Sequence, residues 1–141
     1  MIGSVHMSGA KIACCPPNDA PRLWLRVKHL IVEAMRRGDM GSFEEVERDV
    51  LGNNAYLWVA IEDDVFLAVA VTKVTQGEKE RLCTIVACGG EDFQRFGHLI
   101  KDLEDYARTE GCQAMEVCGR AGWVRLLSEY RPVKVILRKE L

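Results

Sequence analysis

The sequence lacks the marks of several specialised classes of protein. No apolar run in its 141 residues approaches the ~20 that a membrane-spanning helix needs. Residues 1–10 have neither the basic start nor the apolar core of a secretory signal. The net charge of −2 argues against binding nucleic acid through bulk electrostatics. We therefore expect a cytoplasmic protein that binds neither a membrane nor nucleic acid.

Cysteine pairs of the metal-binding type are also missing. The chain has six cysteines but no Cys-x-x-Cys, and its three histidines are far apart in sequence, so we expect no metal site. An even number of cysteines leaves a disulfide framework as an alternative. A chain of this size folds without such bridges, however, and no export signal accompanies it. We expect reduced, mostly buried thiols.

The composition is that of an ordinary globular domain. Apolar residues make up 48% and charged residues 28% of the chain, enough to fill one core. Residues 1–10 are rich in Gly, Ser and His and predict a loose N-terminal arm. We interpret residues 11–141 as a single domain.

The first half of the domain predicts one short strand, over residues 11–15, and two amphipathic helices. The first helix covers residues 22–37 and has Asp19 as a candidate N-cap. The second helix begins at Ser42, and Glu45 three residues later completes a capping box.

Three strands follow, over residues 56–61, 65–74 and 82–88. They are rich in branched and aromatic residues and are joined by short polar links, which is typical of an antiparallel meander. The middle strand is apolar almost throughout and is expected to be buried on both faces.

The stretch from Gly89 to Tyr130 organises the rest of the chain. The Gly89-Gly90 pair predicts a tight turn into a long amphipathic helix over residues 93–110, and Gly111 follows the helix end. A strand over residues 113–118 and a shorter helix that ends at Tyr130 come next. A final strand over 132–138 is expected to face Val133, Val135 and Leu137 to the core. The order β-α-α-β-β-β-α-β-α-β, with helices interleaved with an antiparallel meander, favours an α+β fold over a parallel doubly wound sheet.

This order is similar to the GNAT fold, that of the Gcn5-related N-acetyltransferase superfamily. The resemblance implies a central, mostly antiparallel mixed sheet flanked by helices. The resemblance covers about residues 11–141. Several short motifs resemble, more closely, the GNAT-like proteins encoded by bacteriophages and prophages; they are Trp58-Val59-Ala60, Gly89-Gly90-Glu91-Asp92, Gly111-Cys112, Gly119-Arg120-x-Gly122-Trp123-x-Arg125-x-Leu127, Tyr130 and Lys139-Glu140-Leu141. No defined substrate comes with that resemblance.

The resemblance implies that the chain binds acetyl-CoA. In GNAT proteins the strand before the long helix, here ending at Val86, Ala87 and Cys88, exposes its backbone to the pantetheine arm. The turn into the helix cradles the pyrophosphate, and this implies cofactor-binding roles for Gly89, Gly90, Gln94, Arg95 and Gly97. Arg120 is a candidate for binding an anion such as the 3′-phosphate of coenzyme A; its alternative role is that of a surface arginine that stacks on Trp123.

The phosphate-binding motif departs from the superfamily pattern, which is Gln/Arg-x-x-Gly-x-Gly/Ala. Gln94 and Gly97 fit two of the three positions, and Leu99 occupies the third. Counting back from Gly111 without a gap instead puts Phe96 at the last position, where its side chain would keep phosphate oxygens from the backbone N–H groups.

Acetyl transfer to an amine needs a base for the ammonium and an acid for the leaving thiolate. Glu116 is the only carboxylate on the strands that form the cleft, so it is the candidate base; its alternative role is that of a solvated outward residue. Tyr130 is the candidate acid, and its alternative is to pack at the end of the last helix. Cys88 has no histidine near it in sequence to activate it, which favours direct transfer over a covalent enzyme intermediate.

Two functions remain open from the sequence. The first is an acetyl-CoA-dependent acyltransferase whose amine acceptor is unknown. The second is a non-catalytic GNAT-fold module with a degenerate cofactor site, such as a phage-particle component or a binding partner of a host protein.

Overall fold

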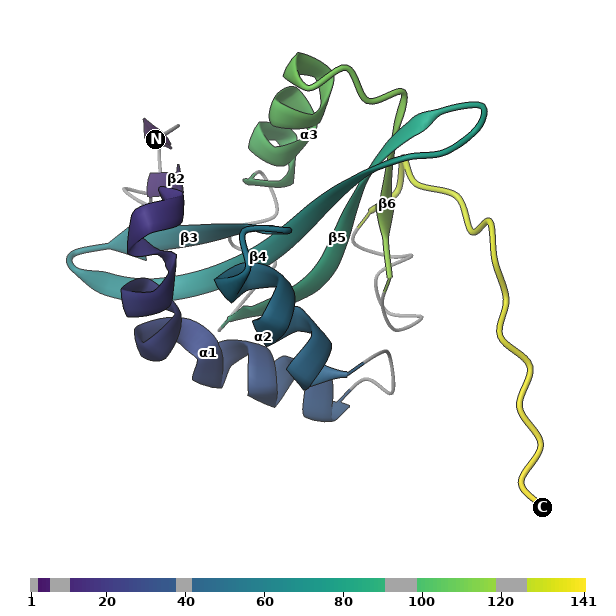
Figure 1. Ribbon diagram of the computed structural model, residues 1–141, viewed down its shortest axis with the longest axis horizontal. Coiled ribbons are helices and arrows are strands. Elements are labelled where there is room, and N and C mark those ends of the chain that lie inside the picture. Colours follow the sequence, from purple (N-terminus) through teal and green to yellow (C-terminus); the bar gives the residue numbers. More distant parts are fainter. Residues whose placement is uncertain (1–2, 6–10, 38–41, 91–98, 119–126) are drawn as a thin grey trace.

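The computed structural model describes residues 3–5, 11–37, 42–90, 99–118 and 127–141. A six-stranded sheet forms its centre, with strands in the order β1-β2-β3-β4-β5-β6 (Figure 1). The strands are β1 (Gly3–Val5), β2 (Lys11–Cys14), β3 (Tyr56–Glu62), β4 (Val65–Gln76), β5 (Arg81–Gly90) and β6 (Ala114–Val117). Neighbours pair antiparallel from β1 to β5, and β6 pairs parallel to β5.

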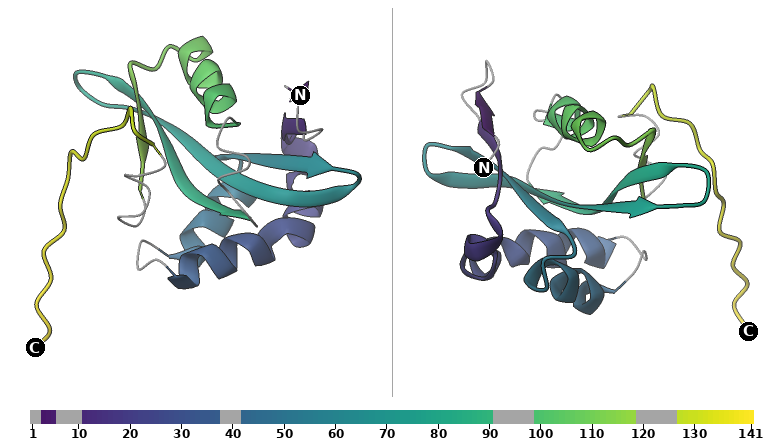
Figure 2. Two further views of the ribbon diagram at one scale, coloured as in Figure 1. Left: turned by 180° about the vertical axis from the view of Figure 1, so that it is seen from behind. Right: turned by 45° about the horizontal axis from the view of Figure 1, so that its top comes forward.

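Helices lie on both faces of this sheet (Figure 2). One face carries α1 (Ala20–Arg37), which follows the short helix η1 (Pro17–Asp19), and α2 (Phe43–Leu51); the other carries α3 (Leu99–Thr109). Two apolar clusters result, one on each face. No helix in the described part of the chain is long and apolar enough to cross a membrane.

The predicted meander is confirmed, and so is the burial of its middle strand. β4 is buried from Ala68 to Thr72, on both faces of the sheet. Thr72 is the one buried polar side chain among the described residues. Its hydroxyl accepts a hydrogen bond from the Trp58 indole N–H at 2.9 Å, so the polar atom is satisfied within the core.

The helix ends agree with the sequence in most details. The Ser42 hydroxyl accepts from the Glu45 backbone N–H and caps α2. The same hydroxyl donates to the Glu44 carboxylate at 2.8 Å. Gly111 follows α3 with φ +78°, the left-handed conformation expected just past a helix end. The predicted helix start at Phe93 lies outside the described residues.

The C-terminal prediction was wrong. Residues 132–138 do not form a strand, and Val133, Val135 and Leu137 do not face the core. The chain instead extends away from the body, as Figures 1 and 2 show. Residues 127–130, predicted as a helix end, form a turn in which Tyr130 N–H donates to the Leu127 carbonyl at 2.9 Å. At the other end, β1 lies within the segment that the sequence predicts to be a loose arm.

Candidate functional site

The outer half of β5 has an open edge. β6 pairs with β5 only along the β5 residues from Leu82 to Ile85. The last hydrogen bond between these two segments runs from the Cys118 N–H to the Ile85 carbonyl at 3.4 Å. From Val86 to Gly90, β5 pairs with β4 alone among the described residues. Among the described residues, no strand pairs with the backbone groups on the other side of this stretch.

A β-bulge stands where this open edge begins. Ala87 pairs with Val71 and Ile85 pairs with Thr72, so Val86 is the extra residue. The bulge shifts the alternation of the strand by one position, and both Ile85 and Cys88 consequently contact the apolar cluster on the α3 face. Bulges of this kind bend a strand and end regular pairing, and they are frequent beside active sites.

The ladder fixes which backbone groups face the opening. Cys15 N–H donates to the Leu57 carbonyl at 2.8 Å, so Leu57 bonds toward β2 and the next residue, Trp58, bonds toward β4. Trp58 pairs with Ala70, and Ala70 pairs with Cys88. Because hydrogen-bonded and non-hydrogen-bonded pairs alternate across an antiparallel strand, Cys88 points its N–H and C=O away from β4. The same alternation applies to Gly90, two residues on.

The glycine pair is not the predicted turn, because Gly89 and Gly90 are the last two residues of β5. A Cβ on Gly89 would lie 2.3 Å from the Leu30 carbonyl oxygen of α1, and a Cβ on Gly90 would lie 2.4 Å from the Leu67 carbonyl oxygen of β4. Gly90 also has φ +149°. Both glycines are thus required by close backbone packing.

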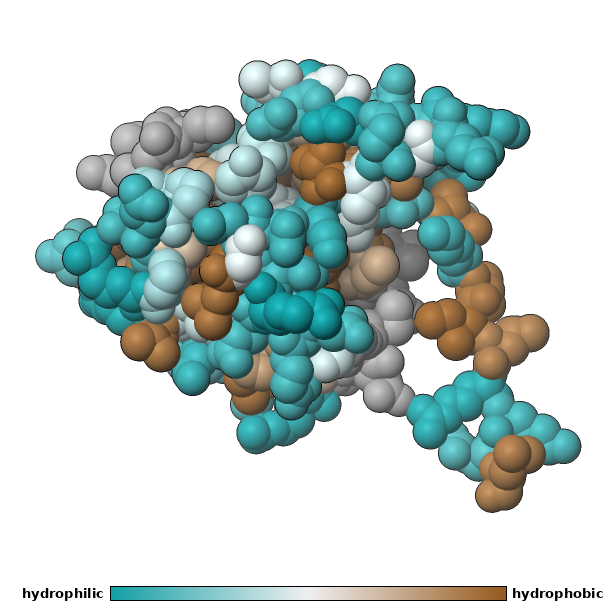
Figure 3. Space-filling view, viewed as in Figure 1, coloured by the Kyte–Doolittle hydropathy of each residue, from teal (hydrophilic) through white to brown (hydrophobic). Residues whose placement is uncertain are grey.

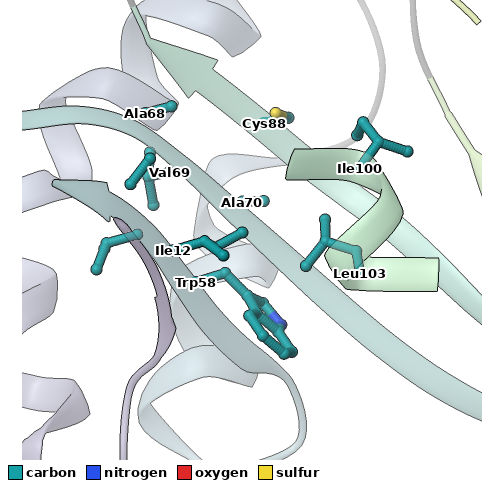
Figure 4. A pocket seen from close by; sticks show the side chains of 10 residues that line it. Ile12, Trp58, Ala68, Val69, Ala70, Cys88, Ile100 and Leu103 are labelled. Carbon is teal, nitrogen blue, oxygen red and sulfur yellow. The ribbon is translucent and has the colours of Figure 1, made fainter. Parts of the chain in front are cut away.

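Cys88 faces a small apolar cavity between the sheet and α3 (Figure 4). Ile100 and Leu103 of α3 close one side, and the small side chains Ala68 and Ala70 of β4 lie opposite. Burial raises the pKa of the Cys88 thiol to about 12. The thiol is therefore neutral at physiological pH, which makes it a poor nucleophile.

The two candidate catalytic residues lie on different faces of the sheet. Met115 and Val117 pack on the α3-side cluster, so Glu116 between them points to the face that carries α1 and α2. It pairs with Thr84 of β5, two residues before the bulge.

Tyr130 instead packs on the α3 side, where its hydroxyl donates to the Glu104 carboxylate at 2.5 Å. Burial and this hydrogen bond raise the pKa of Tyr130 well above its usual range. This is the packing role that the sequence leaves as the alternative, and Glu116 and Tyr130 are not brought together.

Of the predicted cofactor residues, Val86 to Gly90 line the open edge, whereas Gln94, Arg95, Gly97 and Arg120 lie outside the described residues. The bulge was missed, because β5 is apolar on both sides of Val86 and no Gly or Pro marks the position.

In the described ranges, no three His, Cys, Asp or Glu side chains come together to hold a metal ion.

Comparison with known proteins reveals likeness in structure alone. No family model matches the chain, and no curated protein matches it. An aminoglycoside acetyltransferase from an uncultured soil metagenomic sample, solved with sisomicin, superposes with TM-score 0.67 at 16% identity, over 95% of this chain and 97% of the other.

Two further structures give similar values. A predicted acetyltransferase from Clostridium acetobutylicum, solved with acetyl-CoA, has TM-score 0.62 at 12% identity over 94% and 95% of the two chains. A ribosomal-protein-alanine N-acetyltransferase from Brucella melitensis biovar Abortus has TM-score 0.63 at 14% identity over 93% and 99%. In all three superpositions the structural similarity extends over nearly the whole of this chain and of its neighbour, so this protein has the GNAT fold.

Proposed function

We propose that the protein is an acyltransferase that transfers the acetyl group of acetyl-CoA to an amine. The observation that supports this most is the open edge of β5 between Val86 and Gly90, which starts at a bulge where β6 stops pairing. The pantetheine arm of coenzyme A carries amide groups, and amides pair with free strand edges through backbone hydrogen bonds. The residues present therefore fit this cofactor.

The proposal assigns a role to residues of the open edge and to the candidate phosphate-binding residues. Cys88 and Gly90 supply the backbone N–H and C=O groups that hold pantetheine. Gln94, Arg95, Gly97 and Arg120 are proposed to contact the phosphates. Acetyl-CoA supplies an activated thioester, whose C–S bond breaks as a C–N bond forms to the amine. Because the Cys88 thiol is neutral, the amine attacks directly and no acyl-enzyme forms.

Glu116 is the proposed base that takes the proton from the amine. For Tyr130 to be the acid that protonates the leaving thiolate, its hydroxyl would have to leave Glu104. The geometry favours an anchoring role. Tyr130→Phe separates the two roles. If Tyr130 is the acid, the variant has a lower kcat and unchanged stability. If Tyr130 is an anchor, the variant has a lower free energy of unfolding.

The Glu116 role predicts a kinetic effect. Glu116→Gln should lower kcat by about 10²- to 10⁴-fold, the usual contribution of a positioned base. The assay is release of coenzyme A thiol from acetyl-CoA. The first amines to test are sisomicin and peptides that begin with alanine, which match the names of the structural neighbours.

Glu110→Gln is the matched control, because Glu110 is an exposed carboxylate just after α3 and outside the site. If the wild type and Glu116→Gln have equal kcat across pH 6–9, Glu116 is not the base. That result would not contradict the proposed cofactor site.

The second candidate is a GNAT-fold binding module without catalysis, with a protein partner or a phage particle as its setting. One observation favours it: backbone packing against α1 and β4 accounts for Gly89 and Gly90 without any phosphate. The module predicts no acetyl-CoA binding, so calorimetric titration with acetyl-CoA separates the two functions.

A further inference from the structure

A row of polar side chains crosses three neighbouring strands on the face of the sheet that carries α1 and α2. Lys73 of β4 pairs with Thr84 of β5, and Thr84 pairs with Glu116 of β6. Residues that pair across neighbouring strands point to the same face of a sheet. Further along β4, Val69 and Val71 fill this face with apolar side chains. The row is therefore the polar end of an otherwise apolar face, and it lies close to the bulge of β5.

Helix α2 adds an ion pair to one end of the row. The Lys73 ammonium donates to the Asp49 carboxylate at 3.0 Å, and the two side chains are 36% and 16% exposed. The Arg48 guanidinium lies 3.9 Å from the same carboxylate. The backbone N–H groups of Asn54 and Ala55 donate to the Asp49 carbonyl at 2.8 and 3.1 Å. These bonds fix the end of α2, so the ion pair has a defined place beside the row.

The other end of the row is a carboxylate without a cation. Glu116 is half-buried, and within the described ranges no side chain forms a hydrogen bond or an ion pair with it. A half-buried carboxylate of this kind suits a cationic group of a ligand. Figure 3 shows mostly hydrophilic residues over α2, on the same face of the molecule. The surroundings of the row thus suit a charged molecule.

The two ends of the row match two different charged groups. Neighbouring strands are about 4.8 Å apart, which puts Lys73 and Glu116 about 10 Å apart at the backbone. An ion pair is complementary to a zwitterion, whose carboxylate accepts from Lys73 and whose ammonium donates to Asp49. Glu116 is complementary to a second ammonium. An α-amino acid with an amine at the end of its side chain, such as L-lysine or L-ornithine, carries these three groups in this order.

We propose that this row binds the acceptor, and that the acceptor is a free α-amino acid with a terminal side-chain amine. This inference rests on the acyltransferase function proposed above. Lys73 and Asp49 hold the α-carboxylate and the α-ammonium, which directs the terminal ammonium to Glu116. Glu116 takes a proton from that ammonium. The amine nitrogen then forms a C–N bond to the acetyl carbon as the C–S bond of the thioester breaks, and the leaving thiolate takes up a proton.

Calorimetric titration with L-lysine and with cadaverine, which is L-lysine without its carboxylate, is the first test. Both titrations are made with and without coenzyme A, so the result does not depend on turnover. L-lysine should have a dissociation constant at least about tenfold lower than that of cadaverine, the usual effect of a hydrogen bond to a charged group. Equal dissociation constants, or no heat from L-lysine at millimolar concentration in both conditions, would overturn the proposal.

The double variant Asp49→Asn/Lys73→Met provides the second test, because it removes both charges and leaves neither unpaired. It should abolish the preference for L-lysine over cadaverine. Lys79→Met is the control, since Lys79 is exposed in the loop between β4 and β5, and it should keep the preference. If the ion pair only holds α2 on β4, the double variant loses thermal stability and keeps the preference, which would overturn the proposal. Should the double variant not fold, the comparison of the two ligands on the wild type decides.

Release of coenzyme A thiol from acetyl-CoA separates this inference from the proposed function. Binding of L-lysine without any acetylated product would contradict the acyltransferase and leave the binding site in place. Equal kcat/KM for L-lysine and cadaverine would leave the acyltransferase in place and overturn the acceptor class. Mass spectrometry of the product should find the acetyl group on the side-chain nitrogen of L-lysine. An acetyl group on the α-nitrogen would overturn the proposed orientation.

Discussion

At the scale of single residues, Gly89 illustrates how one glycine has two explanations. From sequence alone a Gly-Gly pair before a helix predicts a phosphate-binding turn. In the structure Gly89 lies in β5, and the Leu30 carbonyl oxygen of α1 occupies the space that a Cβ would need. The contact joins residues nearly sixty positions apart, so no local pattern could have revealed it.

This packing role predicts a loss of stability on substitution. Gly89→Ala should lower the free energy of unfolding by about 1–3 kcal/mol, as overpacking usually does, because the nearest atom is backbone and cannot swing away. Urea denaturation measures it. Gly77→Ala is the comparison with a milder contact, since its Cβ would lie 3.1 Å from the Glu80 carbonyl oxygen, against 2.3 Å at Gly89, and it should lose less stability. A Gly89→Ala protein of wild-type stability would refute the packing role.

At the scale of elements, the β3–β4 pair forms the centre of the core. The Trp58 indole N–H donates to Thr72 across the two strands at 2.9 Å, and the ring packs edge-on to Tyr106 of α3 with centroids 4.9 Å apart. Trp58 thereby links two strands and a helix.

Thr72→Val tests this link. It keeps the side-chain shape but leaves the buried Trp58 N–H without a partner, which should cost about 1–3 kcal/mol. Thermal unfolding followed by tryptophan fluorescence reports the change. Thr84→Val on β5 is the control, because Thr84 is only partly buried. If the two variants unfold at the same temperature, the hydrogen bond contributes nothing measurable.

Elements that depend on local signals could be predicted from the sequence, and those that depend on distant partners could not. Ser42 caps α2 and Gly111 follows α3 because each signal lies within a few residues of the element it ends. The bulge at Val86 depends on how β4 and β5 align, which the uniformly apolar strands do not reveal. Residues 132–138 have a strand pattern, but a strand also needs an edge to pair with, and sequence periodicity does not supply one.

Part of the candidate site could be predicted from the sequence, and part could not. The resemblance to GNAT proteins placed the cofactor along Val86 to Gly90, and the structure has an open edge there. Glu116 and Tyr130 were the candidate base and acid, but the alternation of β6 points Glu116 to the face that carries α1 and α2, whereas Tyr130 packs on the α3 side.

At the scale of the whole molecule, stability should depend on pH through the buried and half-buried thiols. All six cysteines are free. Burial raises the pKa of Cys14 and of Cys83 to about 11, and that of Cys88 to about 12. In the unfolded chain the same thiols ionise near their ordinary pKa of ~8.5.

The sign of the effect follows from proton counts. Above about pH 8.5 the unfolded chain has released thiol protons that the folded chain keeps, so the unfolded state binds fewer protons and stability falls as pH rises. The free energy of unfolding should decline between about pH 9 and 11, as chemical denaturation would measure. The Cys14→Ser, Cys83→Ser and Cys88→Ser triple variant should decline less steeply. Equal slopes would rule out ionisation of these thiols as the cause.

The central claim is that the open edge of β5 binds the pantetheine arm through its backbone, and calorimetric titration with acetyl-CoA tests it most directly. Cys88→Pro removes the N–H that faces the opening and keeps the ladder to β4, whereas Cys88→Ala removes only the thiol. With folding verified by circular dichroism, we predict that wild type and Cys88→Ala bind at micromolar concentration and that Cys88→Pro binds at least about tenfold more weakly. Absence of heat from wild type at millimolar acetyl-CoA, or equal binding by Cys88→Pro, would contradict the claim.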